Sequence, residues 1–351
     1  MDIGKVRVYG TFGPACKDFN TLKEMFLEGM DGIRLNLSHT ALEDASDLIE
    51  ACYRAAGECG IIPELLIDMQ GPELRIGMLE FPIQLVNGAL IDIDTVPFPQ
   101  EVKKILAYTP PGQEILLDDG KLLLRTEKPQ SISGIQLRVL RGGKLESRKS
   151  VALPGCQICM PAMTEFDREQ IRKAGHYKVT AIMQPFVRSK EDLLEVRRAL
   201  DESGWKEIKL YAKIENLKGI DMLAELIPFC DEIVIARGDL GNSMELWKLP
   251  AAQKYISAVC RKAGRNFMVV TQMLDSMTHR QVPTRAEVSD IFNAVLDGAS
   301  SVMVTGETAV GDYPVLTIRY LSRTVREAEA FHGLIIEKDT FRYRNEDETE
   351  K

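Results

Sequence analysis

The sequence predicts an α/β protein in which a (β/α)8 barrel carries a small all-β domain inserted after its third strand. Eight strand-like segments alternate with amphipathic helical segments, as in parallel βα units that close into a TIM barrel. Polar and charged residues stand at the ends of these strands, where such barrels carry their chemistry. One stretch, from about Gly77 to Val151, breaks the rhythm with short alternating pieces and turn signals.

Three of the predicted strands precede the insert and five follow it. An open, doubly wound sheet is the alternative, but eight near-regular units favour closure. The strands are expected within 6–12, 32–39, 63–68, 179–183, 209–214, 232–236, 267–271 and 301–305. Helices are expected near 19–27, 41–56, 165–174, 190–202, 218–227, 250–263, 286–296 and 315–330.

This pattern divides the chain into four parts. We expect the first part of the barrel at 1–76, an inserted β lid at 77–152, the second part of the barrel at 153–334 and a charged, solvated tail at 335–351. A chain of 351 residues suits one such barrel with an insertion.

Charge and hydropathy exclude several classes of function. A net charge of −8 and the lack of a basic block argue against nucleic-acid partners. No apolar run approaches the ~18 residues of a membrane span, so we expect no membrane role. The N-terminal residues lack the apolar core of a secretory signal, which predicts a cytoplasmic location.

The segment Leu210–Asn216 is central to the predicted site. In a strand, Lys213 and Glu215 share one face, because side chains i and i+2 point the same way. A surface ion pair is the alternative interpretation, since charged strand residues usually face water. Asp239 follows the next strand, and together with Glu215 it would form a two-carboxylate magnesium site. Backbone amides around Gly238 and Asp239, at the start of a short helix, could bind a carboxylate or phosphate of the substrate.

Residues at the other strand ends extend this chemistry. Lys213 would face developing negative charge, and Arg34 would add a permanently charged phosphate clamp. Thr271 could hydrogen-bond the substrate or position a proton-carrying water. Asn36, Ser38 and Asp68 offer oxygens suited to a monovalent cation. From the residues alone, we infer metal-assisted phosphoryl or enolate chemistry on a small acid.

At these residues the chain resembles the pyruvate kinases, from Lys5 to about Glu327. The matching motifs are Thr11-Phe12-Gly13-Pro14-Ala15, Arg34-Leu35-Asn36-Leu37-Ser38-His39, Gly71-Pro72-Glu73-Leu74-Arg75, Leu117-Asp118-Asp119-Gly120, Leu210–Asn216, Ala236–Gly241, Thr271-Gln272-Met273-Leu274, Pro283-Thr284-Arg285-Ala286-Glu287 and Gly306-Glu307-Thr308-Ala309.

The resemblance implies phosphoryl transfer from phosphoenolpyruvate to ADP, giving pyruvate and ATP in glycolysis. It implies a β lid that closes over the nucleotide. The residue roles carried over are catalytic for Lys213, Thr271 and Arg34; substrate-binding for Gly238, Asp239, Thr271 and Lys213; nucleotide-binding for Asn36, His39, Arg75 and Lys149; Mg²⁺ or Mn²⁺ ligands for Glu215 and Asp239; and K⁺ ligands for Asn36, Ser38, Asp68 and the Met69 carbonyl.

The sequence departs from the family pattern at several positions. Met69-Gln70 replaces the usual Thr-Lys pair, which predicts a perturbed potassium site. Pro185 stands where a serine is usual, and Thr305 keeps a hydroxyl in place of a serine. The family's C-terminal effector domain has no counterpart in the sequence, so we expect no control through it, while a homodimer through barrel helices stays open.

Two alternatives to the kinase remain at this stage. One is a lyase or aldolase of the enolpyruvate type on the same barrel, which the match at Arg75, Lys149 and the lid argues against. The other is a non-catalytic phosphoenolpyruvate-binding pseudoenzyme. A protein that only binds phosphoenolpyruvate would not need all four of the predicted site residues. Their presence argues against this alternative; they are Lys213, Glu215, Asp239 and Thr271.

Overall fold

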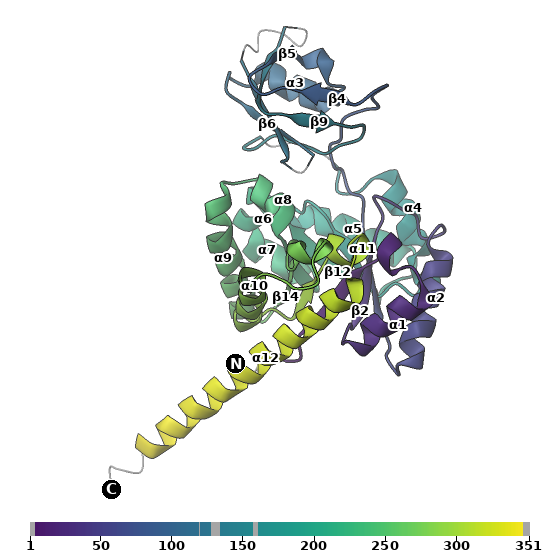
Figure 1. The fold of residues 1–351 in the computed structure, drawn as a ribbon, viewed down its shortest axis with the longest axis vertical. Helices are drawn as coiled ribbons and strands as arrows, with labels where there is room; N and C mark the ends of the chain where they lie inside the picture. The colour runs from purple at the N-terminus through teal and green to yellow at the C-terminus, as the bar shows by residue number, and fades with distance from the viewer. Residues whose placement is uncertain (1–3, 119, 128–133, 157–160, 347–351) are drawn as a thin grey trace.

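Eight parallel strands form a closed barrel in which every strand pairs with its neighbours in the barrel series, and the last strand closes on the first (Figure 1). The computed structural model describes residues 4–118, 120–127, 134–156 and 161–346. The predicted (β/α)8 barrel is confirmed. Its strands are β1 (Arg7–Thr11), β2 (Gly32–Asn36), β3 (Glu64–Asp68), β11 (Ala181–Gln184), β12 (Lys209–Ile214), β13 (Glu232–Ala236), β14 (Asn266–Val270) and β15 (Ser301–Met303).

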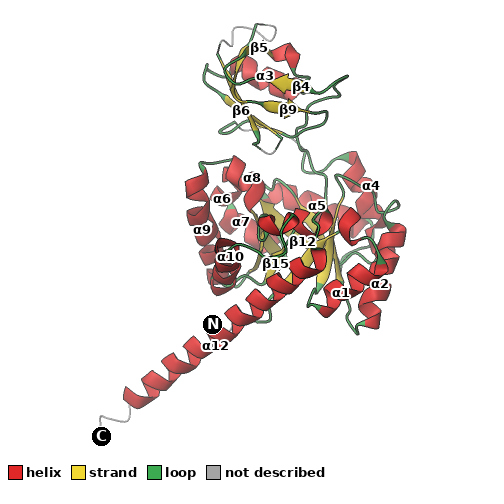
Figure 2. Cartoon of the chain, in the orientation of Figure 1, coloured by secondary structure: helices red, strands yellow, loops and turns green. Residues whose placement is uncertain are grey.

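Helices surround the barrel on its outside (Figure 2). They are α1 (Phe19–Leu27), α2 (Ser46–Glu58), α4 (Glu165–Lys173), α5 (Lys190–Glu202), α6 (Leu217–Asp221), α7 (Leu223–Leu226), α8 (Arg237–Asn242), α9 (Leu249–Lys262), α10 (Arg285–Leu296), α11 (Gly306–Ala309) and α12 (Pro314–Glu346), with the 3₁₀ turns η1 (Pro14–Cys16), η3 (Ala174–Tyr177), η4 (Ile227–Phe229), η5 (Leu246–Lys248) and η6 (Asp275–Thr278).

Alternation along the strands divides the core into two layers. In β12, Leu210, Ala212 and Ile214 are buried in the large cluster between the strands and the helices. Tyr211 belongs instead to the cluster inside the barrel. Because side chains two apart share a face, Lys213 points to the same interior side as Tyr211, at the carboxyl end of the strand. The alternation therefore places Lys213 at the barrel mouth.

The segment between β3 and α4 folds around a core of its own, which runs from Leu74 to Leu153. It holds a five-stranded sheet in the order β10-β6-β7-β8-β5 and a two-stranded sheet of β4 and β9. The elements are β4 (Ile83–Leu85), β5 (Leu90–Asp92), η2 (Ile93–Thr95), α3 (Gln100–Tyr108), β6 (Glu114–Leu117), β7 (Leu122–Thr126), β8 (Gln136–Arg141), β9 (Gly143–Leu145) and β10 (Val151–Ala152).

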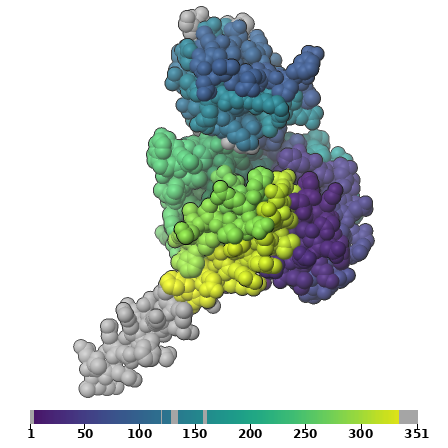
Figure 3. Space-filling view, viewed as in Figure 1, coloured from purple at the N-terminus to yellow at the C-terminus, as the bar shows by residue number. Residues whose placement is uncertain are grey.

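The expectation of an all-β insert is wrong in one respect, because α3 is a helix of nine residues. Val102 and Leu106, four positions apart, are both fully buried on one side of it. The insert sits over one end of the barrel (Figure 3). A Cβ on Gly120 would lie 2.9 Å from Oδ1 of Asn242 in α8, so the two parts touch there.

The last helix is also longer than predicted. We expected the last helix to end near residue 330 and a solvated tail at 335–351, yet α12 continues to Glu346 and runs beyond the barrel (Figure 1). Residues 334–346 contain neither proline nor glycine and are rich in helix formers, so nothing in the sequence stops the helix. Two smaller departures are a later start of α2, at Ser46, and a break of the helix expected at 218–227 into α6, α7 and η4. Among the described residues, no helix combines the length and apolar character that crossing a bilayer requires.

A charged cluster closes the amino-terminal end of the barrel. Arg7 donates to Glu64 at 2.8 Å and to the buried Glu232 at 2.8 Å, and the Tyr9 hydroxyl donates to Glu64 at 2.5 Å. Burial alone would raise the pKa of Glu64, but the Tyr9 hydroxyl and the charges of Arg7 and Lys209 hold that pKa below its ordinary value.

We expect Glu64→Gln to lower the free energy of unfolding by about 2 kcal/mol at neutral pH. Because the pKa of Glu64 is depressed in the folded state, its contribution is full above the unfolded value near ~4.3 and is lost as pH falls through the folded value. Urea unfolding at pH 7 and at pH 3 should therefore show a smaller effect in acid. Glu58→Gln, which breaks an exposed pair with Lys23, is the control. An equal loss at both pH values would contradict this account.

Candidate active site

The strand ends bring the predicted residues to one mouth of the barrel. In the register of the sheet, Asn36 pairs with Asp68, and Asp68 pairs with Met183 of β11. On the other side, Ala236 pairs with Val270, one residue before Thr271. Because parallel strands end at the same edge, residues that follow them share that edge. Glu215 directly follows β12, and Thr305 lies two residues past β15.

Two cations and two carboxylates alternate at this mouth. The Arg34 guanidinium donates twice to Oδ2 of Asp68, at 2.9 and 2.7 Å. Lys213 Nζ lies 3.0 Å from the same oxygen and 2.9 Å from Oε1 of Glu215. The Glu215 side chain is 1% exposed and that of Lys213 13%. The predicted Lys213–Glu215 pair thus exists, and it is buried, so the alternative of a surface ion pair is wrong.

Burial and charge act in opposite directions on these groups. Burial would lower the pKa of Lys213, but the carboxylates of Asp68 and Glu215 raise that pKa above its usual value. Burial would raise the pKa of Asp68, but Lys213 and Arg34 hold that pKa below its usual range. Asp68 and Lys213 are therefore both ionised at neutral pH. The site offers fixed positive charge to an anion without reorganisation.

The loop after β13 and the loop after β14 meet beside this network. Asp239 lies in the first turn of α8, as predicted. A Cβ on Gly238 would lie only 3.0 Å from Cγ2 of Thr271, so this glycine allows the two loops to approach closely. The predicted substrate-binding residues Gly238, Asp239 and Thr271 are thereby neighbours.

Sequence reasoning missed two residues that shape the Thr271 loop. Thr271 and Gln272 both have positive φ, at 77° and 55°, which is unfavourable for a β-branched residue such as threonine. Arg237 donates to the Thr271 carbonyl at 2.8 and 3.2 Å and pairs with Asp290 at 2.5 Å. Arg237 lies in a quoted motif and Asp290 three residues beyond one, but their contacts join segments more than thirty residues apart, which spacing does not reveal.

A third missed residue is Glu307, whose side chain is buried. It accepts hydrogen bonds from the backbone N–H of Leu274 at 3.1 Å and of Thr305 at 2.7 Å. The carboxylate thus joins the loop after β14 to the loop after β15. Glu307 lies in one of the quoted motifs, but the sequence alone indicates no role for it.

The predicted nucleotide-binding residues divide between barrel and insert. Burial, followed by the charges of Arg75 and Arg34, lowers the pKa of His39. Arg75 also pairs with Glu73 at 2.6 Å and donates to the Arg148 carbonyl at 2.9 Å.

Lys149 lies in the insert and pairs with Asp118 there, at 2.9 Å. The backbone of Ile76 donates to the Lys149 carbonyl at 2.9 Å, so Lys149 and Arg75 stand on paired segments at the base of the insert. Asp119 of the recognised 117–120 motif lies outside the described residues.

The residues predicted to hold potassium are adjacent, and the side-chain oxygens of Asn36 and Asp68 already accept hydrogen bonds. Asn36 Oδ1 accepts from the Ser38 backbone N–H at 3.1 Å. Both Asp68 oxygens accept from Lys213, at 3.1 and 3.0 Å. The Met69 backbone N–H donates to the Met183 carbonyl at 3.1 Å, which keeps its peptide at the end of β3. A potassium ion here would therefore compete with protein cations for Asp68.

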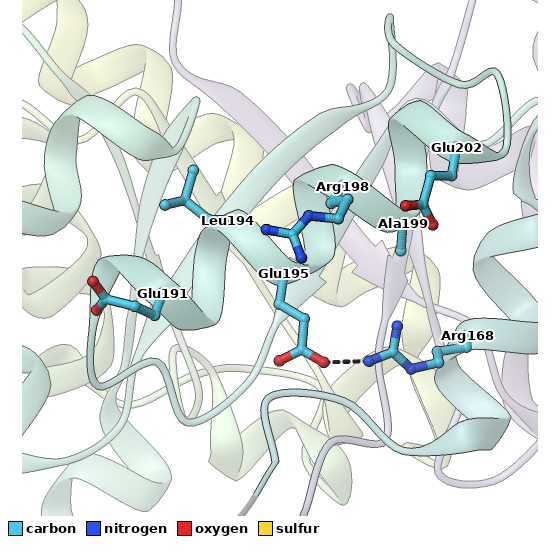
Figure 4. A pocket seen from close by; sticks show the side chains of 7 residues that line it. All are labelled: Arg168, Glu191, Leu194, Glu195, Arg198, Ala199 and Glu202. Carbon is cyan, nitrogen blue, oxygen red and sulfur yellow. Dashed lines mark hydrogen bonds and ion pairs between the residues drawn. The ribbon is translucent and has the colours of Figure 1, made fainter.

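A pocket of about 360 Å³ lies on the outside of the barrel, between α4 and α5 (Figure 4). Its lining is charged and includes an ion pair between Arg168 and Glu195. None of the predicted site residues lines it, so it is separate from the barrel mouth.

Comparison with known proteins decides the family of this chain. The family model for the barrel domain of pyruvate kinases matches residues 3–318. The chain belongs to the pyruvate kinase family. It is similar to pyruvate kinases from Sporosarcina psychrophila (34% identical, 93% of this chain), Schizosaccharomyces pombe (35%, 91%) and Homo sapiens (36%, 94%). The chain spans 57%, 65% and 61% of the lengths of these pyruvate kinases.

Proposed function

We propose that this chain is a phosphotransferase that moves the phosphoryl group of phosphoenolpyruvate to ADP, giving pyruvate and ATP. The observation that carries the proposal is the buried network of Arg34, Asp68, Lys213 and Glu215 at the carboxyl end of the barrel. Two fixed cations stand beside carboxylates there, which suits an anionic substrate and a divalent cation together.

Arg34 and Lys213 bind the phosphoryl oxygens and stabilise the charge that develops during transfer. The bond from the enol oxygen to phosphorus breaks while an oxygen of the ADP β-phosphate bonds to phosphorus. Lys213 then faces the enolate oxygen that remains. Thr271 positions the water that delivers a proton to the methylene carbon, which yields pyruvate. Backbone amides at Gly238 and Asp239 orient the substrate carboxylate.

Glu215 and Asp239 are the proposed ligands of Mg²⁺ or Mn²⁺. Their carboxylate oxygens are hard donors, and the rigid setting of Glu215, whose Oε2 accepts from the Phe186 N–H at 2.8 Å, favours a fixed coordination geometry. When bound, the divalent ion neutralises the negative charge shared by the two substrates. Binding of the phosphoryl group, stabilisation of its charge and proton delivery are carried out by Arg34, Lys213 and Thr271.

Potassium is part of the proposal through Asn36, Ser38, Asp68 and the Met69 carbonyl. The contacts of Asp68 with Arg34 and Lys213 mean that potassium would share this carboxylate with both. His39, Arg75, Lys149 and Asn36 are proposed to bind the nucleotide. We also propose a cytoplasmic location. The proposed division of the chain has two barrel parts, 1–76 and 153–334, and a lid at 77–152.

Incubation with phosphoenolpyruvate, ADP and Mg²⁺, with and without K⁺, tests this function directly. We expect pyruvate and ATP in equal amounts, and faster turnover with K⁺. Omitting ADP should leave phosphoenolpyruvate intact, which separates the kinase from a lyase. Binding of phosphoenolpyruvate without any pyruvate would reject the kinase in favour of a non-catalytic protein. An identical rate without K⁺ would reject the potassium site alone.

A further inference from the structure

One buried carboxylate outside the site joins both connections between barrel and insert. Asp167, in the first turn of α4, is fully buried. Its Oδ1 accepts from the Gln70 backbone N–H at 2.8 Å. Its Oδ2 accepts from the Gly71 N–H at 3.0 Å and from the N–H and hydroxyl of Thr164, at 2.9 and 2.8 Å. Four donors from two distant segments therefore converge on one side chain.

Those donors lie where the chain leaves the barrel and where it returns. Gln70 and Gly71 follow β3 on the way to the insert, and Thr164 precedes α4 on the way back. Closer to the insert, the two connections pair a second time, because the Val151 N–H donates to the Leu74 carbonyl at 2.8 Å. The Asp167 carboxylate thus fixes the barrel side of both connections at one point.

Gly71 is held from its other side as well. It has φ +61°, and a Cβ on it would lie 2.3 Å from Cγ of Pro185. Pro185 follows β11, and the next residue, Phe186, donates its N–H to Glu215. The loop after β11 therefore touches the connection to the insert and the proposed metal ligand at once. The unusual Pro185 has a packing role here.

We infer that Asp167 is a positioning residue that sets where the insert stands over the barrel mouth. This inference rests on the proposed function, in which Lys149 in the insert and Arg75 at its base bind the nucleotide. The helix cap does not account for the arrangement. A capping box requires only the reciprocal Thr164–Asp167 contacts, whereas Gln70 and Gly71 lie more than ninety residues earlier in the chain.

Asp167→Asn tests the inference, because asparagine keeps the shape but turns an N–H₂ group toward N–H donors. We expect the KM for ADP to rise about tenfold and the KM for phosphoenolpyruvate to change less than about twofold. Because asparagine keeps only one acceptor oxygen, one of the Gln70 and Gly71 amides loses its acceptor, and hydrogen exchange of that amide should speed up by about tenfold or more. Hydrogen exchange can be measured even if the protein forms no pyruvate. In that case, the Kd of ADP from calorimetry replaces the KM for ADP.

Two control variants separate positioning from helix stability. Thr164→Ala removes the cap partner but leaves the bonds to Gln70 and Gly71, and Asp18→Asn alters the N-cap of α1, far from the insert. Both should leave the two KM values in their wild-type ratio. If Thr164→Ala reproduces the ADP effect, the cap explains it and the inference fails. Unchanged ADP kinetics and unchanged exchange in Asp167→Asn would overturn it too.

If Asp167→Asn does not fold, Gly71→Ala carries the test. Its methyl group would press on Pro185 and strain a positive φ, which moves the same connection while the Asp167 side chain itself is unchanged. The inference requires the same split, with weaker ADP binding and nearly unchanged phosphoenolpyruvate binding. An equal loss for both substrates would contradict it.

Discussion

Lys213→Met should lower kcat by on the order of 10³-fold, because one fixed charge aimed at a developing anion contributes several kcal/mol to the transition state. The ammonium lies between Asp68 and Glu215 and is held ionised by both. Methionine fills similar space without charge, so substrate access should persist. Steady-state rates of pyruvate formation give the result.

The substitution also leaves two buried carboxylates with less compensation, so stability must be followed in parallel. Arg7→Met is a matched control, since Arg7 likewise bridges two carboxylates, Glu64 and Glu232, at the opposite end of the barrel. We expect Arg7→Met to lose stability and to keep kcat within about twofold below its melting temperature. If Lys213→Met keeps wild-type kcat, or Arg7→Met loses as much, Lys213 has no special part in transfer.

The barrel was predictable because its signal is local. Each strand shows alternation within about five residues, and β12 places Tyr211 and Lys213 inside and Ala212 and Ile214 outside as the period requires. The helix α3 carried a similar signal in Val102 and Leu106. That signal is weak because α3 occupies only nine residues among short strands and turns.

The site was predictable only in part, for a related reason. Position at a strand end indicates that Arg34, Asp68 and Lys213 lie close together, but not which oxygen faces which cation. The family resemblance implies that Asp68 binds potassium, whereas in the structure Asp68 accepts from the protein's own cations, Arg34 and Lys213. Contacts such as Asp167 with Gly71 join residues with no sequence relation, so only the folded chain reveals them.

Glu215→Gln should reduce kcat/KM about 10²- to 10³-fold and raise the Mg²⁺ concentration needed for half-maximal rate. Glutamine can still accept the Phe186 N–H bond, so the loop after β11 should keep its place. What is lost is the negative charge, on which both the divalent ion and Lys213 depend. Titration of the rate with Mg²⁺ and with Mn²⁺ measures the effect, and the shift should appear with both ions.

Glu232→Gln is the matched control for this prediction. Glu232 is as buried as Glu215 and also pairs with a cation, but it lies at the amino-terminal end of the barrel. Losing its charge should lower stability without changing the Mg²⁺ requirement. If Glu215→Gln and Glu232→Gln shift the Mg²⁺ titration equally, the effect is one of folding, and Glu215 is not the metal ligand. If only Glu215→Gln shifts it, the metal site lies at the mouth where Lys213 stands, and the two carboxylates differ by position alone.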